Sequence, residues 1–190
     1  MTLTSLPFLL FAAVTVLLYY LVPTRGQWIV LLIASTLFYA SAGGWYLPFI
    51  LVTILTTFFL ARVIENRAKA DEDYIATHKA DMDKDARKAY KAAGKKKRFR
   101  ILTAGLILNF GILAVLKYTG FTVSTVNDIL GLFTESRLTV PSLILPLGIS
   151  FYTFRSTAYI IDVYRGKAKA AANLGKYALF ISFFPAVMQG

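Results

Sequence analysis

An arginine and an aspartate lie inside an otherwise apolar segment near the end of the chain. Arg155 and Asp162 both fall within the hydrophobic residues 143–164, together with Tyr152 and Tyr159. Lipid does not solvate charge, so ionisable side chains in such segments face a bundle interior or a water-filled cavity and often serve a substrate or ion path. These four residues are therefore our candidates for lining or supporting a functional site.

The spacing of these polar groups indicates their arrangement on a helix. Arg155 and Asp162 are seven residues apart, which places them on similar faces but about 10 Å apart along the axis, so we do not expect them to pair. Arg165, three residues beyond Asp162, is the better local partner. A helix whose hydroxyl groups bond neighbouring helices and a helix that lines a polar path explain the segment equally well. One face carries hydroxyl groups at three- and four-residue steps, at Ser150, Thr153, Thr157 and, less regularly, Tyr164.

Composition indicates an integral membrane protein. Hydrophobic residues make up 57% of the chain and charged residues 16%, whereas a soluble domain has about 25% charged residues. Thirteen of the 21 Lys and Arg and seven of the ten Asp and Glu lie between Arg62 and Arg100. The net charge of +11 thus belongs to a polar loop beside membrane spans, and we expect no nucleic-acid partner.

Two residue types restrict the chemistry. The chain has no Cys, which excludes a disulfide, a thiol nucleophile and a thiolate metal site within these residues. The only histidine, His78, lies among charges in the polar loop. We interpret it as a solvated side chain and not as a catalytic base, and we expect no metal site and no bound cofactor.

The apolar segments predict an all-α fold, a polytopic transmembrane helix bundle. The predicted spans are residues 6–22, 27–42, 45–64, 101–116 and 143–164. A further apolar segment begins at Tyr177 and extends only twelve residues, to Met188, whereas a crossing needs about twenty. We therefore expect the chain to be the incomplete N-terminal part of a larger membrane protein.

Four regions follow from this pattern: 1–64 with three spans, a basic helical loop at 65–100, a fourth span and external connection at 101–144, and the region 145–190. Within them, Gly94 is expected to interrupt the helix of the loop. Asn109 is expected to form an interhelical hydrogen bond or to line a polar path. Residues 126–133 predict a short interfacial helix.

Charge predicts the orientation in the cell membrane. Basic residues mark the cytoplasmic side, so the loop 65–100 is expected to be cytoplasmic and the amino terminus outside. Arg25 and Arg165 then also fall on the cytoplasmic side. The basic run of this loop is best explained as a topology determinant; the alternative is a docking surface for an acidic cytosolic partner or anionic lipid headgroups.

Three stretches of the last region resemble a known signature. They read LPLGISFYTF, AYIIDVYRG and KYALFISFFPAVMQG, in this order within residues 145–190. They are similar to the signature of the membrane-bound O-acyltransferase family, in its bacterial branch that acts on alginate. Residues 1–144 share only the general layout. One departure is that the family commonly has Gln where this chain has Arg155.

The resemblance implies an enzyme that transfers an acyl group to a hydroxyl through a tunnel in a helix bundle. It implies acetyl-CoA as the cytoplasmic donor, an extracytoplasmic polysaccharide as acceptor, and extracytoplasmic partner proteins. The catalytic histidine of the family lies in its later half, and His78 does not match it. We therefore expect the full-length parent to be an O-acyltransferase and this chain alone to be inactive.

Three other functions are also consistent with the residues of this chain. One is D-alanyl transfer to teichoic acid, which is a related reaction. Another is a transporter or channel subunit, in which Arg155 and Asp162 would line a solute path. The third is a scaffold without catalysis that recruits partners through the loop 65–100.

Overall fold

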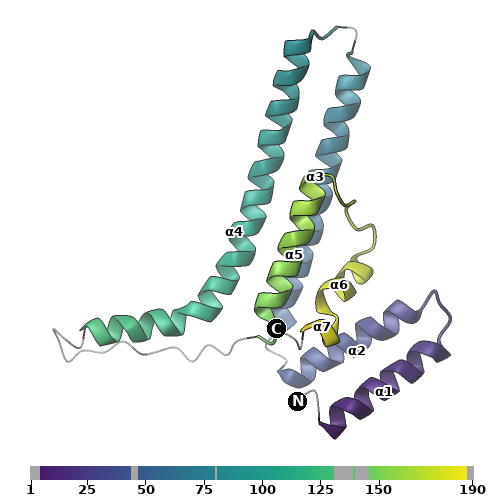
Figure 1. Cartoon of the computed structure of the whole chain (residues 1–190), viewed down its shortest axis with the longest axis vertical. Helices are drawn as coiled ribbons and strands as arrows, with labels where there is room; N and C mark the ends of the chain where they lie inside the picture. Colours follow the sequence, from purple (N-terminus) through teal and green to yellow (C-terminus); the bar gives the residue numbers. More distant parts are fainter. Residues whose placement is uncertain (1–4, 44–46, 80, 131–138, 140–145, 188–190) are drawn as a thin grey trace.

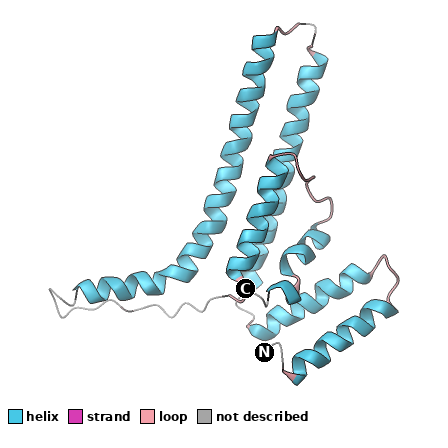
Figure 2. Cartoon of the chain, viewed as in Figure 1, coloured by secondary structure: helices cyan, strands magenta, loops and turns pink. Residues whose placement is uncertain are grey.

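The computed structural model of the chain describes residues 5–43, 47–79, 81–130, 139 and 146–187. In this part of the chain every regular element is an α-helix and no strand is present (Figure 2). The prediction of an all-α helix bundle is confirmed. In chain order the helices are α1 (Leu6–Leu21), α2 (Gln27–Ala42), α3 (Leu47–Thr77), α4 (Lys84–Leu130), α5 (Ile149–Tyr164), α6 (Leu174–Ser182) and α7 (Phe184–Val187).

Helices α3 and α4 form a long antiparallel hairpin along which the other helices are arranged (Figure 1). Among the described residues, they are the two helices that are long enough and apolar enough to cross a membrane. Both continue past their apolar parts into the polar segment 65–100. The predicted boundaries at 64 and 100 therefore fall inside helices, and the polar segment is the outer arm of the hairpin.

Gly94 does not interrupt this arm, so that prediction is wrong. It lies buried inside α4, and a Cβ atom at this position would collide with the carboxylate of Asp71 on α3. Arg98, one turn further along α4, forms an ion pair of 3.8 Å with the same carboxylate. The glycine thus allows close approach of the two helices, and the contact between them offsets its low helix propensity.

The end of α4 also differs from expectation. The sequence predicted a separate interfacial helix over 126–133, but α4 is continuous to Leu130, and 131–133 lie outside the described residues. The helix bends, and its last part runs sideways, away from the hairpin (Figure 1). The predicted fourth span is therefore the middle part of one 47-residue helix.

Helix α5 packs along the apolar half of the hairpin, in contact with both α3 and α4 (Figure 1). Its core contacts include Ile160, which packs with Ala61 of α3 and Leu102 of α4. The beginning of the predicted fifth span, 143–145, lies outside the described residues, as do 188–190.

Helices α1 and α2 form a pair at the foot of the hairpin (Figure 1). Each has 16 residues, slightly fewer than the range of about 17–25 that is usual for a membrane crossing, so their spanning stays a prediction. An aromatic cluster connects them to α7, with ring centroids 5.3 to 6.2 Å apart. Its members are Phe8, Phe11, Phe38 and Phe184.

The last apolar segment is broken into two short helices. Phe183 leaves helical geometry at ψ 109° and separates α6 from α7. The backbone N–H of Phe184 then donates to the hydroxyl of the buried Ser35 on α2, at 3.3 Å. A buried backbone N–H outside a regular helix needs a hydrogen-bond partner, and Ser35 provides one.

Candidate functional site

Helix α5 directs one side into the bundle, as the sequence predicted. Thr153, Ser156 and Thr157 are buried on this side. The hydroxyl of Ser156 donates to the carbonyl of Thr153 at 2.9 Å, and within the described residues the Thr157 hydroxyl has no partner. Buried hydroxyl groups near neighbouring helices are typical of membrane bundles.

Tyr152 lies on this buried side and is completely enclosed. It belongs to the core cluster that also contains Tyr39 of α2 and Ile54 of α3. The hydroxyl of Tyr39 donates to the carbonyl of Leu147 at 3.0 Å, whereas the Tyr152 hydroxyl has no partner among the described residues. Tyr152 is therefore a core residue with an unused hydroxyl, turned toward α2 and α3.

Arg155 lies against α6. Its guanidinium is 4.3 Å from the ring centroid of Phe180 and 5.5 Å from that of Phe151. Such contacts stabilise a cation that has left water. Its Nη1 atom is buried and has no hydrogen-bond partner within the described part of the chain. Arg155 is thus held by aromatic faces, and one of its donor nitrogens has no partner among the described residues.

Tyr159 follows Arg155 by one turn and also faces α6. Its ring is 4.7 Å from that of Tyr177 and 6.5 Å from that of Phe180. Its hydroxyl accepts a hydrogen bond of 2.7 Å from the backbone N–H of Ala171, in the link between α5 and α6. Tyr159 therefore fixes where the chain leaves α5 and enters α6.

Glu65 of α3 holds the same link from the other side. Its Oε2 atom accepts a hydrogen bond of 2.9 Å from the N–H of Ala170, and its Oε1 atom pairs with Lys69 at 2.9 Å. The hydrogen bond from Lys69 is the main cause that lowers the pKa of Glu65; burial opposes it, and the hydrogen bond from Ala170 adds a smaller lowering effect. No sequence pattern pointed to Glu65, because its partner is a backbone group 105 positions away.

Asp162 does not form the predicted ion pair. Among the described residues, neither Arg165 nor Arg155 lies within ion-pairing distance of its carboxylate. Its backbone carbonyl instead accepts from the N–H groups of Lys167 and Ala168, at 2.9 and 3.3 Å. Arg165 stands at the C-terminal cap of α5, where the chain turns away. The three-residue spacing of Asp162 and Arg165 is therefore not sufficient to form an ion pair here.

The four candidates do not converge on one point. Arg155, Tyr159 and Asp162 are four and three residues apart, so they share the side of α5 that faces α6 and the link. Tyr152 precedes Arg155 by three residues and Tyr159 by seven, so it continues the same side toward the start of α5. There it lies in the core cluster against which Tyr159 also packs. The four candidates thus follow one side of α5, from the core at Tyr152 to the end of the helix near Asp162.

A second polar contact joins α3 and α4 next to this helix. Asn109 is 1% exposed, and its Nδ2 atom donates to the Gly105 carbonyl at 3.1 Å and to the Thr57 hydroxyl at 3.5 Å. This is the interhelical contact that the sequence indicated. Thr57 itself was missed; its four-residue spacing from Thr53 in an apolar helix is the signal that could have revealed it.

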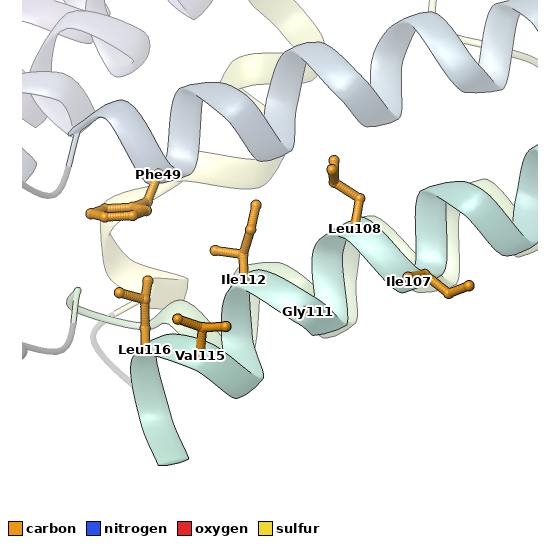
Figure 3. A pocket seen from close by; sticks show the side chains of 7 residues that line it. All are labelled: Phe49, Ile107, Leu108, Gly111, Ile112, Val115 and Leu116. Atoms are coloured by element: carbon orange, nitrogen blue, oxygen red, sulfur yellow. The ribbon is translucent and has the colours of Figure 1, made fainter. Parts of the chain in front are cut away.

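An open apolar groove of about 380 Å³ lies between the start of α3 and the middle of α4 (Figure 3). Its lining residues are apolar, so they offer no group for acid–base chemistry. Within the described residues no group of His, Asp and Glu side chains could hold a metal ion. The lining consists of Phe49, Ile107, Leu108, Gly111, Ile112, Val115 and Leu116.

The sequence is similar to several curated proteins. It is 34% identical over 187 residues to a probable alginate O-acetylase of Pseudomonas aeruginosa, which covers 95% of this chain. It is 34% identical over 173 residues to the protein of the same name from Azotobacter vinelandii, which covers 91%. It is 29% identical over 187 residues to a peptidoglycan O-acetyltransferase of Helicobacter pylori, which covers 86%. No family model and no solved structure matches the chain.

The chain spans 30% of the length of each of these relatives. The similarity extends through nearly all of the chain, including the early helices for which the sequence showed only a common layout. The membrane-spanning length of α3 and α4 agrees with a membrane protein. Over the length that the chain spans, these relatives support its resemblance to the membrane-bound O-acyltransferase family, in the branch of the alginate O-acetylases.

Proposed function

We propose that this chain works as part of a membrane O-acetyltransferase that modifies a polysaccharide. The observation that carries the proposal is the 34% identity to alginate O-acetylases over 95% of the chain. The peptidoglycan O-acetyltransferase relative supports acetyl transfer to a glycan hydroxyl over D-alanyl transfer or solute transport. Acetyl-CoA is the proposed donor, and the acceptor is an extracytoplasmic glycan that is reached with partner proteins.

In this proposal α5 and α6 form part of the wall along which the acyl group passes. Arg155, Tyr159 and Asp162 lie on the edge of α5 that faces α6 and the link. The orientation follows from charge: the hairpin arm at 65–100 carries twelve Lys and Arg, so we place it in the cytoplasm. The link with Lys167 and Lys169 then lies on the same side as the donor.

The 190-residue chain on its own should not transfer acetyl groups. Its only histidine, His78, lies on the hairpin arm, where its ring stacks at 4.2 Å on Tyr74 and its Nδ1 atom is 3.0 Å from the Tyr74 carbonyl. A general base must reach the proton that it removes, and α5 lies along the other half of the hairpin. Labelled acetyl-CoA with the purified chain and an alginate oligosaccharide tests this expectation.

A chimera tests the proposed function itself. The matching segment of the Pseudomonas aeruginosa alginate O-acetylase is replaced by these 190 residues and expressed in a strain that lacks the native gene. We expect acetyl esters on the secreted alginate, measured by NMR. The control replaces the same segment with that of the Azotobacter vinelandii relative.

Two results would contradict the proposal. The first is a chimera that reaches the membrane in normal amounts but leaves alginate without acetyl esters, while the control restores them. The second is labelled acetyl transfer by the isolated chain, because this would require a base that we have not assigned.

A further inference from the structure

Four lysines form a line along one face of α4 where it belongs to the hairpin arm. Lys84, Lys88, Lys91 and Lys95 are separated by four, three and four residues, so they project from one face of the helix. All four are exposed, and none forms an ion pair within the described residues. We call these residues the lysine stripe.

The stripe destabilises its own helix. Like charges three or four residues apart on a helix repel one another, and the stripe contains three such neighbouring pairs. Between residues 84 and 100 the only acidic residue is Asp85, which lies about a quarter turn from Lys84. Asp71 on α3 already pairs with Arg98 on the inner side of the arm. Glu72 of α3 lines an open pocket together with Lys91, but within the described residues no carboxylate forms an ion pair with any of the four lysines.

The arm is nevertheless an ordered structure. Tyr74 of α3 stacks on Tyr90 of α4 with ring centroids 4.7 Å apart, and Gly94 fits against Asp71. Near the turn, Nε of Arg87 donates to the carbonyl of Met82 at 3.0 Å. A topology determinant needs only positive charge, whereas these contacts fix the direction in which the stripe points.

Most of the stripe stands clear of the lipid headgroups. The apolar part of α4 begins at Ile101, so Lys88 and Lys84 lie roughly 20 and 25 Å further out along the continuous helix. The headgroup layer is only about 5–8 Å thick on each side of the bilayer. Lys95 can reach this layer, but the outer part of the stripe meets a soluble partner or water.

Charge also argues against a second copy of the same arm as the partner. Residues 65–100 contain twelve Lys and Arg but seven Asp and Glu, so two arms repel each other. The four stripe lysines extend over about 16 Å along the helix axis, a length that matches a helix with carboxylates at the same spacing. We propose that the lysine stripe is the docking surface for an acidic soluble protein that presents such a helix. This inference does not depend on the proposed acetyltransferase function.

The test uses the whole chain in vesicles of uncharged phosphatidylcholine. The probe is a fluorescent 20-residue helical peptide with glutamates at positions i, i+4, i+7 and i+11. The stripe variant carries Lys84→Gln, Lys88→Gln and Lys91→Gln. The matched control carries Lys96→Gln, Lys97→Gln and Arg100→Gln, which removes the same charge from the other sides of the same helix.

We expect the stripe variant to bind the peptide roughly tenfold more weakly than the unchanged chain, and the control to lose less than about threefold. Equal losses in the two variants would show attraction by net charge alone and would overturn the proposal. Absence of binding to the unchanged chain would overturn it as well. Circular dichroism of both variants shows whether the arm stays helical.

A second measurement distinguishes a protein partner from the membrane. The substitution Lys88→Cys introduces a single thiol, because the chain has no Cys, and a thiol-reactive fluorophore then labels this position alone. In vesicles that contain spin-labelled anionic headgroups, we expect little quenching of this fluorophore. Strong quenching would show that the stripe lies on lipid, and the proposal of a soluble partner would then be wrong.

Discussion

Gly148 lies directly against Val187, and this contact joins the start of α5 to α7. Gly148 adopts φ +64°, in the left-handed region, and a Cβ atom here would collide with the Val187 side chain and lie 2.8 Å from its carbonyl oxygen. Both residues belong to the signature-like stretches of the sequence. The two stretches therefore meet at a point that has no room for a side chain at position 148.

Replacement of Gly148 with Ala should therefore destabilise the bundle. The left-handed backbone alone costs about 1–2 kcal/mol for a residue with a side chain, and the collision with Val187 adds to it. We expect a clear drop in the melting temperature of the protein in detergent, together with less protein in the membrane.

Two other glycines provide matched controls for this change. Gly166 has φ +73° but open space around it, so Gly166→Ala measures the backbone cost without a collision. Gly111 lies in α4 with nothing within 4 Å, so Gly111→Ala should be neutral or slightly stabilising. Equal melting temperatures for the Gly148 and Gly166 variants would contradict the tight contact with Val187.

The hydrogen bond from Ala170 to Glu65 should depend on pH. The pKa of Glu65 is lower in the folded protein than in the unfolded chain, first because of Lys69 and then because of Ala170. The stabilisation is complete above the unfolded pKa and is lost as the pH falls through the lower, folded pKa. We expect hydrogen exchange of the Ala170 amide, corrected for its intrinsic rate, to become faster in that acidic range.

Substitutions separate this effect from general loosening of the link. Glu65→Gln should remove the pH dependence at Ala170. Tyr159→Phe removes the hydroxyl oxygen that accepts the hydrogen bond from the Ala171 amide. Exchange of the Ala171 amide should therefore become faster at every pH, because the tyrosine hydroxyl is neutral throughout this range. The same acid-dependent exchange in the Glu65→Gln variant would exclude Glu65 as the titrating group.

Asn109 and Thr57 should show a small coupling energy. Their contact is buried but long, at 3.5 Å, and side-chain hydrogen bonds between membrane helices contribute about 0.6 kcal/mol on average. A double-mutant cycle of Asn109→Ala and Thr57→Val, measured by reversible unfolding in detergent micelles, should give a value of this order. A coupling energy of zero would show that the carbonyl of Gly105 is the partner of Asn109 that matters.

Arg155→Gln should leave the fold intact. Arg155 has no ion pair within the described residues, so the change removes a cation–π contact with Phe180, which contributes about 0.5–2 kcal/mol. We expect normal expression, a slightly lower melting temperature and, in the alginate O-acetylase chimera, a modest change in acetylation. Phe180→Leu should reproduce the stability loss if the aromatic contact is its cause. Loss of all folded protein would instead reveal a structural partner of Arg155.

Much of the fold could be predicted because lipid imposes a simple rule on sequence. Apolar segments of sufficient length became helices, and Asn109, the one amide in its span, became a contact between helices. The side of α5 with hydroxyl groups turned inward, because these groups have no partners in lipid. Each of these predictions rests on the chemistry of the membrane and needs no knowledge of distant contacts.

The errors arose where distant contacts decided the outcome. Gly94 has a low helix propensity, but Asp71 and Arg98 on the inner side of the arm keep α4 continuous there. Asp162 and Arg165 have favourable spacing, but the helix ends between them. Glu65 could not be selected as a binding residue, since its partner is a backbone amide in a remote link. The sequence pattern contains no signal for such pairs.

The continuity of α4 fixes the rotational phase of its parts. Each residue of an α-helix advances about 100° around the axis, so the direction of the lysine stripe is set by the same rotation that turns Leu102 and Asn109 toward the core. Insertion of a single alanine between the stripe and Leu102 would swing the stripe by more than a quarter turn while leaving its charges unchanged. A continuous α4 therefore fixes the direction of the lysine stripe relative to the direction in which Leu102 and Asn109 point into the core.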